Sequence, residues 1–319
     1  MKKTLCLGLL GFVVLLAAAP AAFGWGSATH FYMTDLIMKG NGVPNADELY
    51  GCMAPDVFNY MFDNPAFLGF LQDQTHHEFM KVWLARRNGH ERPDAYGFVA
   101  HNDTWGEDST AHHNSRTLLP SEGYVITKAK ALHAYLWANS QDYRDFALLG
   151  VDESTYIELC HEMVEAAGDI LIAQVNPNLG KRIVKAALRP AKDMQNLLVR
   201  AYLDDFVAYA SSISMPLTSD EAKALILANE QGFRQSMVAY GTLLQEDEAT
   251  IIQGMVSIYS GMVTQYLAAL GITLPPGTDV SPLIEASIGV ALQLIQGDYM
   301  REVFATKNFV AIRLKNHLN

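Results

Sequence analysis

Apolar residues recur three and four positions apart along most of the chain, and the alternation typical of strands is scarce. This spacing predicts helices over residues 29–39, 76–88, 93–101 and 154–172. Gly40 and Gly42 would close the first and Gly89 the second, while Pro93 would open the third at its first helical position. The pattern predicts an all-α fold.

Helical signals continue after residue 180. Pro190 is expected to start a helix, and Thr218 followed by Glu221 is a capping box that starts the next one. Ser281 and Pro282 would start the last helix, after a break at residues 275–277. Without a repeat or a low-complexity linker, we expect one helical domain over residues 25–319, in which the helical part from 180 to 319 is mainly structural.

Residues 249–278 contain no charged side chain, which is compatible with a membrane-docking helix. Polar residues such as Gln253, Ser257 and Thr264 interrupt the stretch. A buried helix of a bundle has the same pattern, and this second interpretation is preferred.

The first 24 residues have the composition of a secretory signal peptide. Lys2 and Lys3 precede an apolar stretch over residues 5–20, and Ala22 and Gly24 have the small-residue spacing of a cleavage site. The apolar stretch is short for a membrane span. We therefore expect cleavage between Gly24 and Trp25 and export of the mature chain, which would be periplasmic or secreted.

Composition and charge then limit the classes of function that the chain can have. Removing residues 1–24, with their two lysines, leaves 295 residues with 21 basic and 34 acidic side chains, a formal charge of -13. A surface this acidic makes nucleic acid an unlikely partner, because phosphate contacts need lysine and arginine. Phosphate chemistry here would depend on metal ions. Cys52 and Cys160 remain after cleavage, and export permits either a disulfide or two buried thiols.

Histidines are concentrated in one part of the chain. Seven of the ten lie between His30 and His113, mostly beside carboxylates. Imidazole and carboxylate are the ligands that zinc prefers where thiolates are few. The candidate set is His30, Asp56, His76, His77, His101, Asp103, Asp108, His112, His113, His161 and Glu165.

Two local features support metal binding. His161 and Glu165 are four residues apart on a predicted helix, so both can reach one ion. Cleavage before Trp25 would also give a free amine which, with the Trp25 carbonyl, is a ready chelate five residues before His30.

At these residues the chain resembles the zinc-dependent phospholipases C, which are related to single-strand-specific zinc nucleases. Mature chains of that family begin with a metal-binding tryptophan, and their helical domain holds three zinc ions. The motif matches lie in the family's order between residues 25 and 170. The resemblance implies metal ligands at Trp25, His30, Asp56, His76, His101, His112, His161 and Glu165, with His77 and His113 as alternates to their neighbours.

One position departs from the family pattern. The family usually has a zinc-bridging aspartate four residues after the histidine matched by His101, whereas this chain has Trp105. Asp103 and Asp108 are the available replacements. Asp108 is preferred, because a helix break at Gly106 would let it fold back beside His112.

The resemblance implies hydrolysis of a phosphodiester, with phospholipid as the favoured substrate and Asp56 as the residue that orients or deprotonates water. Peripheral contact with a membrane would follow from that substrate. Two alternatives stay open: a zinc-dependent single-strand nuclease, and a non-catalytic zinc-binding relative that has lost the bridging aspartate.

Overall fold

The computed structural model describes residues 25–41, 45–59, 61, 64–119, 121–269 and 271–318, so the predicted leader lies outside the described residues. The described part is all-α, as predicted, and contains no strand. Its α-helices are α2 (Ser27–Asn41), α3 (Ala46–Gly51), α4 (Pro65–His76), α5 (Met80–Leu84), α6 (Arg92–His101), α7 (Glu107–His112), α8 (Tyr124–Asn139), α9 (Gln141–Asp145), α10 (Glu153–Val175), α11 (Leu179–Ala187), α12 (Lys192–Ser212), α13 (Ser219–Leu243), α14 (Glu248–Ala269), α15 (Ser281–Ile295) and α16 (Tyr299–Leu318). Two short 3₁₀ helices, η1 (Ala54–Phe58) and η2 (Phe146–Leu149), complete them.

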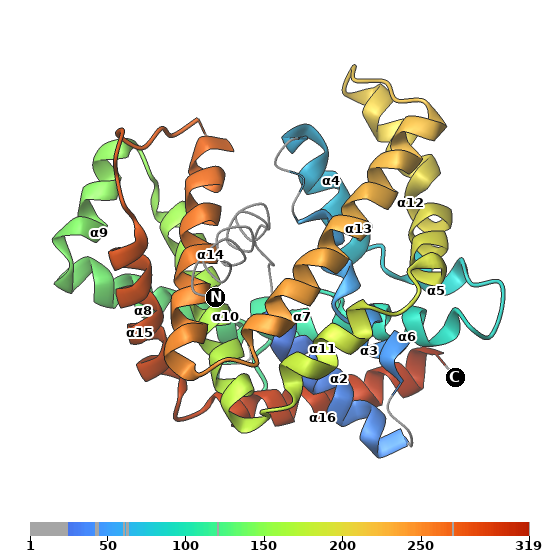
Figure 1. Cartoon of the computed structure of the whole chain (residues 1–319), viewed down its shortest axis with the longest axis horizontal. Coiled ribbons are helices and arrows are strands. Elements are labelled where there is room, and N and C mark those ends of the chain that lie inside the picture. Colours follow the sequence, from blue (N-terminus) through green and yellow to red (C-terminus); the bar gives the residue numbers. More distant parts are fainter. Residues whose placement is uncertain are drawn as a thin grey trace, which may run out of the picture.

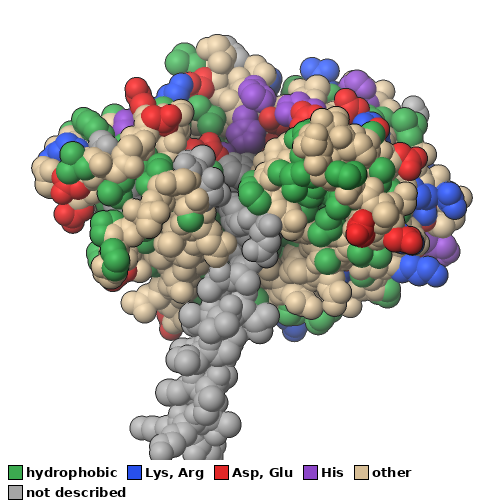
Figure 2. All heavy atoms as spheres, turned by 90° about the horizontal axis from the view of Figure 1, so that it is seen from above, with side chains coloured by type: hydrophobic (Ala, Val, Ile, Leu, Met, Phe, Trp, Pro, Cys, Tyr) green, Lys and Arg blue, Asp and Glu red, His purple; other side chains and the backbone are tan. Residues whose placement is uncertain are grey.

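The helices form two groups that meet along α2, α10 and α11. Figure 1 shows α8, α9, α14 and α15 on one side and α4, α5, α12 and α13 on the other, with α16 along the bottom of the view, packed against α2. Helix α10 packs against α8, α15 and α2, and α13 packs against α11, α12 and η1. Figure 2 shows the molecule from above, and histidine and acidic side chains gather at the upper centre of that view.

Several predicted helix starts are confirmed. Helix α6 has Pro93 in its first turn, and Thr218 and Glu221 form a complete capping box at the start of α13. Helix α10 begins one residue before the predicted Ser154, because the Asp152 side chain caps it by accepting a hydrogen bond from the Thr155 N–H.

Several predicted boundaries are wrong. His76 ends α4 instead of starting a helix, and α5 is a separate short helix. The His76 carbonyl accepts a hydrogen bond from the Asp103 N–H at 3.0 Å, so a distant segment satisfies it in place of a continuing helix. The helix that begins at Ser281 is not the last, since α16 follows it.

The uncharged stretch at residues 249–278 contains the bundle helix α14. Its residues Ile251, Met255 and Leu267 are buried, and the helix packs against α10 and α15. Among the helices of the described residues, none has the length and apolar character needed to cross a membrane.

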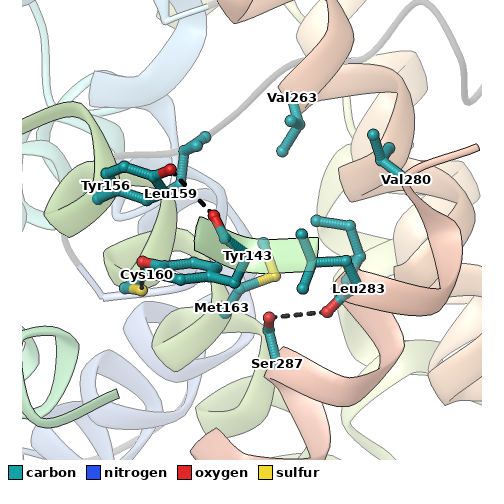
Figure 3. A pocket seen from close by; sticks show the side chains of 10 residues that line it. Tyr143, Tyr156, Leu159, Cys160, Met163, Val263, Val280, Leu283 and Ser287 are labelled. Atoms are coloured by element: carbon teal, nitrogen blue, oxygen red, sulfur yellow. Dashed lines mark hydrogen bonds between the residues drawn. The ribbon is translucent and has the colours of Figure 1, made fainter. Parts of the chain in front are cut away.

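Both cysteines are free thiols, so the disulfide considered from the sequence is not formed. The Cys52 thiol donates to the Leu49 carbonyl at 3.2 Å, and the Cys160 Sγ lies 3.1 Å from the Tyr143 hydroxyl. Cys160 lines a small apolar pocket between α10 and α15 (Figure 3). Each thiol is thus buried among its own neighbours.

Candidate metal centre

Trp25 lies at the centre of the candidate site. Its backbone nitrogen is 3.3 Å from Asp108 Oδ1, and its indole N–H donates to the Glu107 carbonyl at 2.9 Å. The ring is 1% exposed and stacks on Tyr124. The nitrogen that the sequence analysis assigned to metal binding is therefore directed at a buried carboxylate.

Asp169 of α10 holds the start of α2 in this position. Its carboxylate accepts hydrogen bonds from the N–H groups of Ala28 and Thr29 at 2.9 and 2.8 Å and from the Thr29 hydroxyl. A Cβ on Gly26 would lie 2.5 Å from the same carboxylate. Glycine is thus required at position 26, and helix N-terminal N–H groups anchor the chain next to Trp25.

The first cluster is built around Asp108, which is fully buried. Its Oδ1 lies 2.9 Å from His30 Nε2, and its Oδ2 lies 2.9 Å from His101 Nε2 and 3.5 Å from His76 Nε2. Asp56 Oδ1 is 3.4 Å from His76 Nε2 and 3.6 Å from His101 Nε2. Two potential metal-binding groups therefore overlap at His101, with Asp108 between His30 and the other two histidines.

The far side of each imidazole in this cluster is held by an acceptor. The Nδ1 of His101 lies 2.8 Å from the Cys52 carbonyl, and that of His76 lies 2.9 Å from the Gln72 carbonyl. The Nδ1 of His30 lies 2.6 Å from Glu107 Oε2. A carbonyl only accepts, so Nδ1 carries the proton in His101 and His76, which leaves Nε2 as the ligand atom.

The turn between α6 and α7 brings Asp108 back to His101. The Asn102 side-chain oxygen accepts hydrogen bonds from the N–H groups of Thr104, Trp105 and Gly106, which ends α6. Helix α7 then starts after Gly106. Asp108, the preferred replacement for the aspartate of the resembled family, thus joins His30 and His101 in the first cluster. The contact with His112 that was expected of Asp108 is made by Asp103.

Trp105 contributes packing and lies outside the cluster. Its ring stacks on His317 of α16, with centroids 4.8 Å apart, and meets Phe79 edge-on. Trp105 therefore fills space between α16 and the segment that carries Phe79.

A second cluster lies on one face of α10. His161 Nε2 is 2.7 Å from Glu165 Oε1, and His161 Nδ1 is 3.6 Å from Glu158 Oε1. The His112 ring meets the His161 ring edge-on, with centroids 5.2 Å apart. His161 therefore contacts both Glu165 and His112. The donor groups close enough to share one ion, however, join His161 to Glu158 and Glu162, and His112 to Asp103 and His113.

The alternate ligands His77 and His113 lie around Asp103 at the edge of the second cluster. Asp103 Oδ1 lies 2.9 Å from His112 Nδ1, while Oδ2 lies 3.0 Å from His113 Nε2 and 3.7 Å from His77 Nε2. The side chains of His77 and His113 are about half exposed. Asp103 therefore orients His112, and the two outer histidines lie outside both buried clusters.

Charged groups within the first cluster strongly change the pKa values of its histidines. Burial opposes protonation of His30, but Asp108 and Glu107 outweigh it and raise the His30 pKa well above its usual value. Burial also opposes protonation of His76, yet Asp56 and Asp108 raise its pKa to about 9. Protons thus occupy positions where cations would be equally stabilised.

The donor set fits divalent metal ions. Asp108 Oδ2 faces His101 Nε2 at 2.9 Å without a hydrogen bond, because the His101 proton lies on Nδ1, and Asp56 Oδ2 is also buried without a hydrogen bond within the described residues. A buried carboxylate oxygen without a partner is costly, and a cation would satisfy it. Imidazole and carboxylate donors suit zinc in particular.

Sequence reasoning missed four acidic residues that belong to the centre: Glu107, Glu158, Glu162 and Asp169. Glu107 directly precedes Asp108, and the other three lie at helical spacing around His161 and Glu165. That spacing was the signal available for them in the sequence.

Comparisons with protein-family models, curated proteins and solved structures gave no match for this chain.

Proposed function

We propose that this protein is an exported, zinc-dependent phosphodiester hydrolase that acts as a phospholipase C. The observation that carries the proposal is the buried Asp108 carboxylate, which lies between His30 and His101 and is directed at the Trp25 nitrogen. Three nitrogen donors around one buried carboxylate form an arrangement suited to a carboxylate that bridges two ions.

Three ions are proposed, each with its own donors. Trp25, His30 and Asp108 would hold one, and His112, His161 and Glu165 would hold another. Asp56, His76, His101 and Asp108 would hold the third. Bound zinc would supply Lewis acidity and a water of lowered pKa, which this acidic chain lacks among its side chains.

Asp56 is assigned the proton transfer in the reaction. Asn59 Nδ2 donates to Asp56 Oδ1 at 2.8 Å and fixes the carboxylate, while Oδ2 is buried without a hydrogen bond in the described part. Asp56 Oδ2 would accept the proton of the attacking water, and Oδ1 would stay beside His76 and His101.

Export is part of the proposal, because only cleavage after Gly24 converts the Trp25 nitrogen into an amine that can bind metal. The predicted periplasmic or secreted location and the peripheral contact with a phospholipid membrane accompany it. The non-catalytic alternative was based on the loss of the bridging aspartate at Trp105. The position of Asp108 between His30 and His101 supports the catalytic proposal instead. The acidic surface favours phospholipid over nucleic acid.

The test begins with the native mass of the exported protein, which reports its N-terminus and bound ions together. We expect a chain starting at Trp25 with three zinc ions and hydrolysis of phosphatidylcholine vesicles to diacylglycerol. Asp56→Asn and Asp108→Asn should abolish turnover, whereas Asp204→Asn, at an exposed site on α12, should match wild type. Cleavage of single-stranded DNA but not of phospholipid would favour the nuclease. Three ions without turnover of either substrate would refute catalysis.

A further inference from the structure

The second cluster contains more carboxylates than the proposed set of His112, His161 and Glu165. Glu158 and Glu162 lie on the same face of α10, three residues before and one residue after His161. One ligand atom each from Glu158, His161 and Glu162 lie within 4.8 Å of one another. Neither glutamate was assigned a role by the resemblance.

Glu162 is the more deeply buried of the two. It is 4% exposed, and both of its carboxylate oxygens are buried without a hydrogen bond among the described residues. By contrast, the Glu158 side chain is 29% exposed and lies near the Nδ1 edge of His161. Glu158 therefore has water and an imidazole edge available, and Glu162 has neither hydrogen-bond donors nor bulk solvent.

The charged groups around Glu162 do not neutralise its negative charge. Its electrostatic neighbours include three carboxylates, namely Glu165, Glu158 and Asp56, against the single imidazole of His161. A carboxylate buried among carboxylates is strongly unfavourable unless a cation lies among them.

We propose that Glu162 is a direct ligand of the divalent cation held by the second cluster, together with His112, His161 and Glu165. The inference rests on the proposed function only in requiring that this cluster bind a cation. It adds a fourth protein donor, so the ion would be held by two imidazoles and two carboxylates. Four protein donors complete a tetrahedral zinc site.

The test measures metal retention and does not depend on turnover. Zinc-loaded wild type, Glu162→Gln and Glu153→Gln are titrated with a competing chelator, and the ions bound per chain are counted by native mass spectrometry. Glu153 is an exposed residue at the start of the same helix and serves as the matched control. We expect Glu162→Gln to release one ion at least about tenfold more readily than wild type and Glu153→Gln to match wild type.

Retention of all ions by Glu162→Gln with unchanged affinity overturns the proposal. If that variant does not fold, a crystal structure of the zinc-loaded wild type decides, because a ligand oxygen lies about 2.0–2.2 Å from zinc. A Glu162 carboxylate outside bonding distance of the ion would refute its role. Loss of one ion in Glu162→Gln, in a protein that hydrolyses no phospholipid, would support this inference while refuting the proposed function. A wild-type second cluster that binds no ion would overturn this inference.

Discussion

Replacing Glu107 by glutamine tests whether a carboxylate behind His30 determines the affinity of the first cluster. Glu107 is fully buried, its Oε2 lies 2.6 Å from His30 Nδ1, and its Oε1 accepts a hydrogen bond from the Thr34 hydroxyl at 3.1 Å. The carboxylate keeps the His30 proton on Nδ1 and turns Nε2 toward Asp108. Glutamine has nearly the same shape, but its amide is neutral and can turn a donor toward Nδ1, which would favour the wrong tautomer.

The size of the effect follows from this contact. Loss of a partner that orients a metal-binding histidine typically costs 10- to 100-fold in metal affinity, about 1.4 to 2.7 kcal/mol. The contacts of the Trp25 indole and the Thr110 hydroxyl with the Glu107 backbone carbonyl do not depend on the side chain, so they survive the change. We expect the affinity for one ion to fall by that factor and the helical content to stay the same.

The assay is a chelator competition followed by native mass spectrometry, with Glu230→Gln as control. Glu230 of α13 is also fully buried and accepts hydrogen bonds from Tyr50, Gln195 and Arg234, none of which is a candidate metal ligand. In a His30→Ala background, Glu107→Gln should have no further effect on affinity. Zinc binding by Glu107→Gln within twofold of wild type, or an equal loss in Glu230→Gln, would refute the reasoning.

Four further outcomes are expected. Burial and neighbouring carboxylates raise the pKa of Asp94 to about 8, so the folded chain binds this proton more tightly than the unfolded chain does. Its stabilising contribution is therefore present below about pH 4 and is lost as the pH rises through about 8. Asp94→Asn should flatten this decline in the free energy of unfolding, measured by urea denaturation at several pH values. Even half of the Asp94 pKa shift corresponds to about 3 kcal/mol. An unchanged pH dependence would contradict the assignment. Thr218→Ala removes the capping box of α13 and should cost about 1 kcal/mol in the same assay, while an unchanged midpoint would show that the cap contributes nothing. Thiol titration of the denatured, unreduced protein should find both Cys52 and Cys160 free, and a result of zero thiols would mean that they pair. Trp105→Phe should leave the number of bound ions unchanged, because the ring packs on His317 outside the cluster; loss of an ion would give Trp105 a part in the site.

The helices were largely predictable because their signals are local. Pro93, Thr218 and Glu221 act within one turn of the helix that they start, so the sequence alone locates them. The end of α4 was not predictable in this way. The His76 carbonyl is satisfied by the N–H of Asp103, 27 residues later, and no local pattern reports such a contact.

The candidate ligands were predictable as a set, but the residues that orient them were only partly so. Histidines beside carboxylates identify His101 and Asp108 without knowledge of the fold, and the family resemblance adds Asp56. Glu107 acts on His30, which is 77 residues away in the chain, and Glu162 has an ordinary position on a helix until its burial is known. Their roles depend on tertiary packing, which composition and spacing do not describe.

The position of Asp108 shows why a departure in sequence need not be a departure in space. On a continuous helix, Asp108 would lie about 10 Å along the axis from His101, too far to share an ion with it. The three hydrogen bonds to the Asn102 side chain end α6 directly after His101, and α7 then starts in a new direction, which places the two side chains 2.9 Å apart. Position 105, where the resembled family has its aspartate, then lies in the turn, and Trp105 can pack against α16 without cost to the cluster. The ligand set therefore depends on the turn at Asn102 as much as on the ligands themselves.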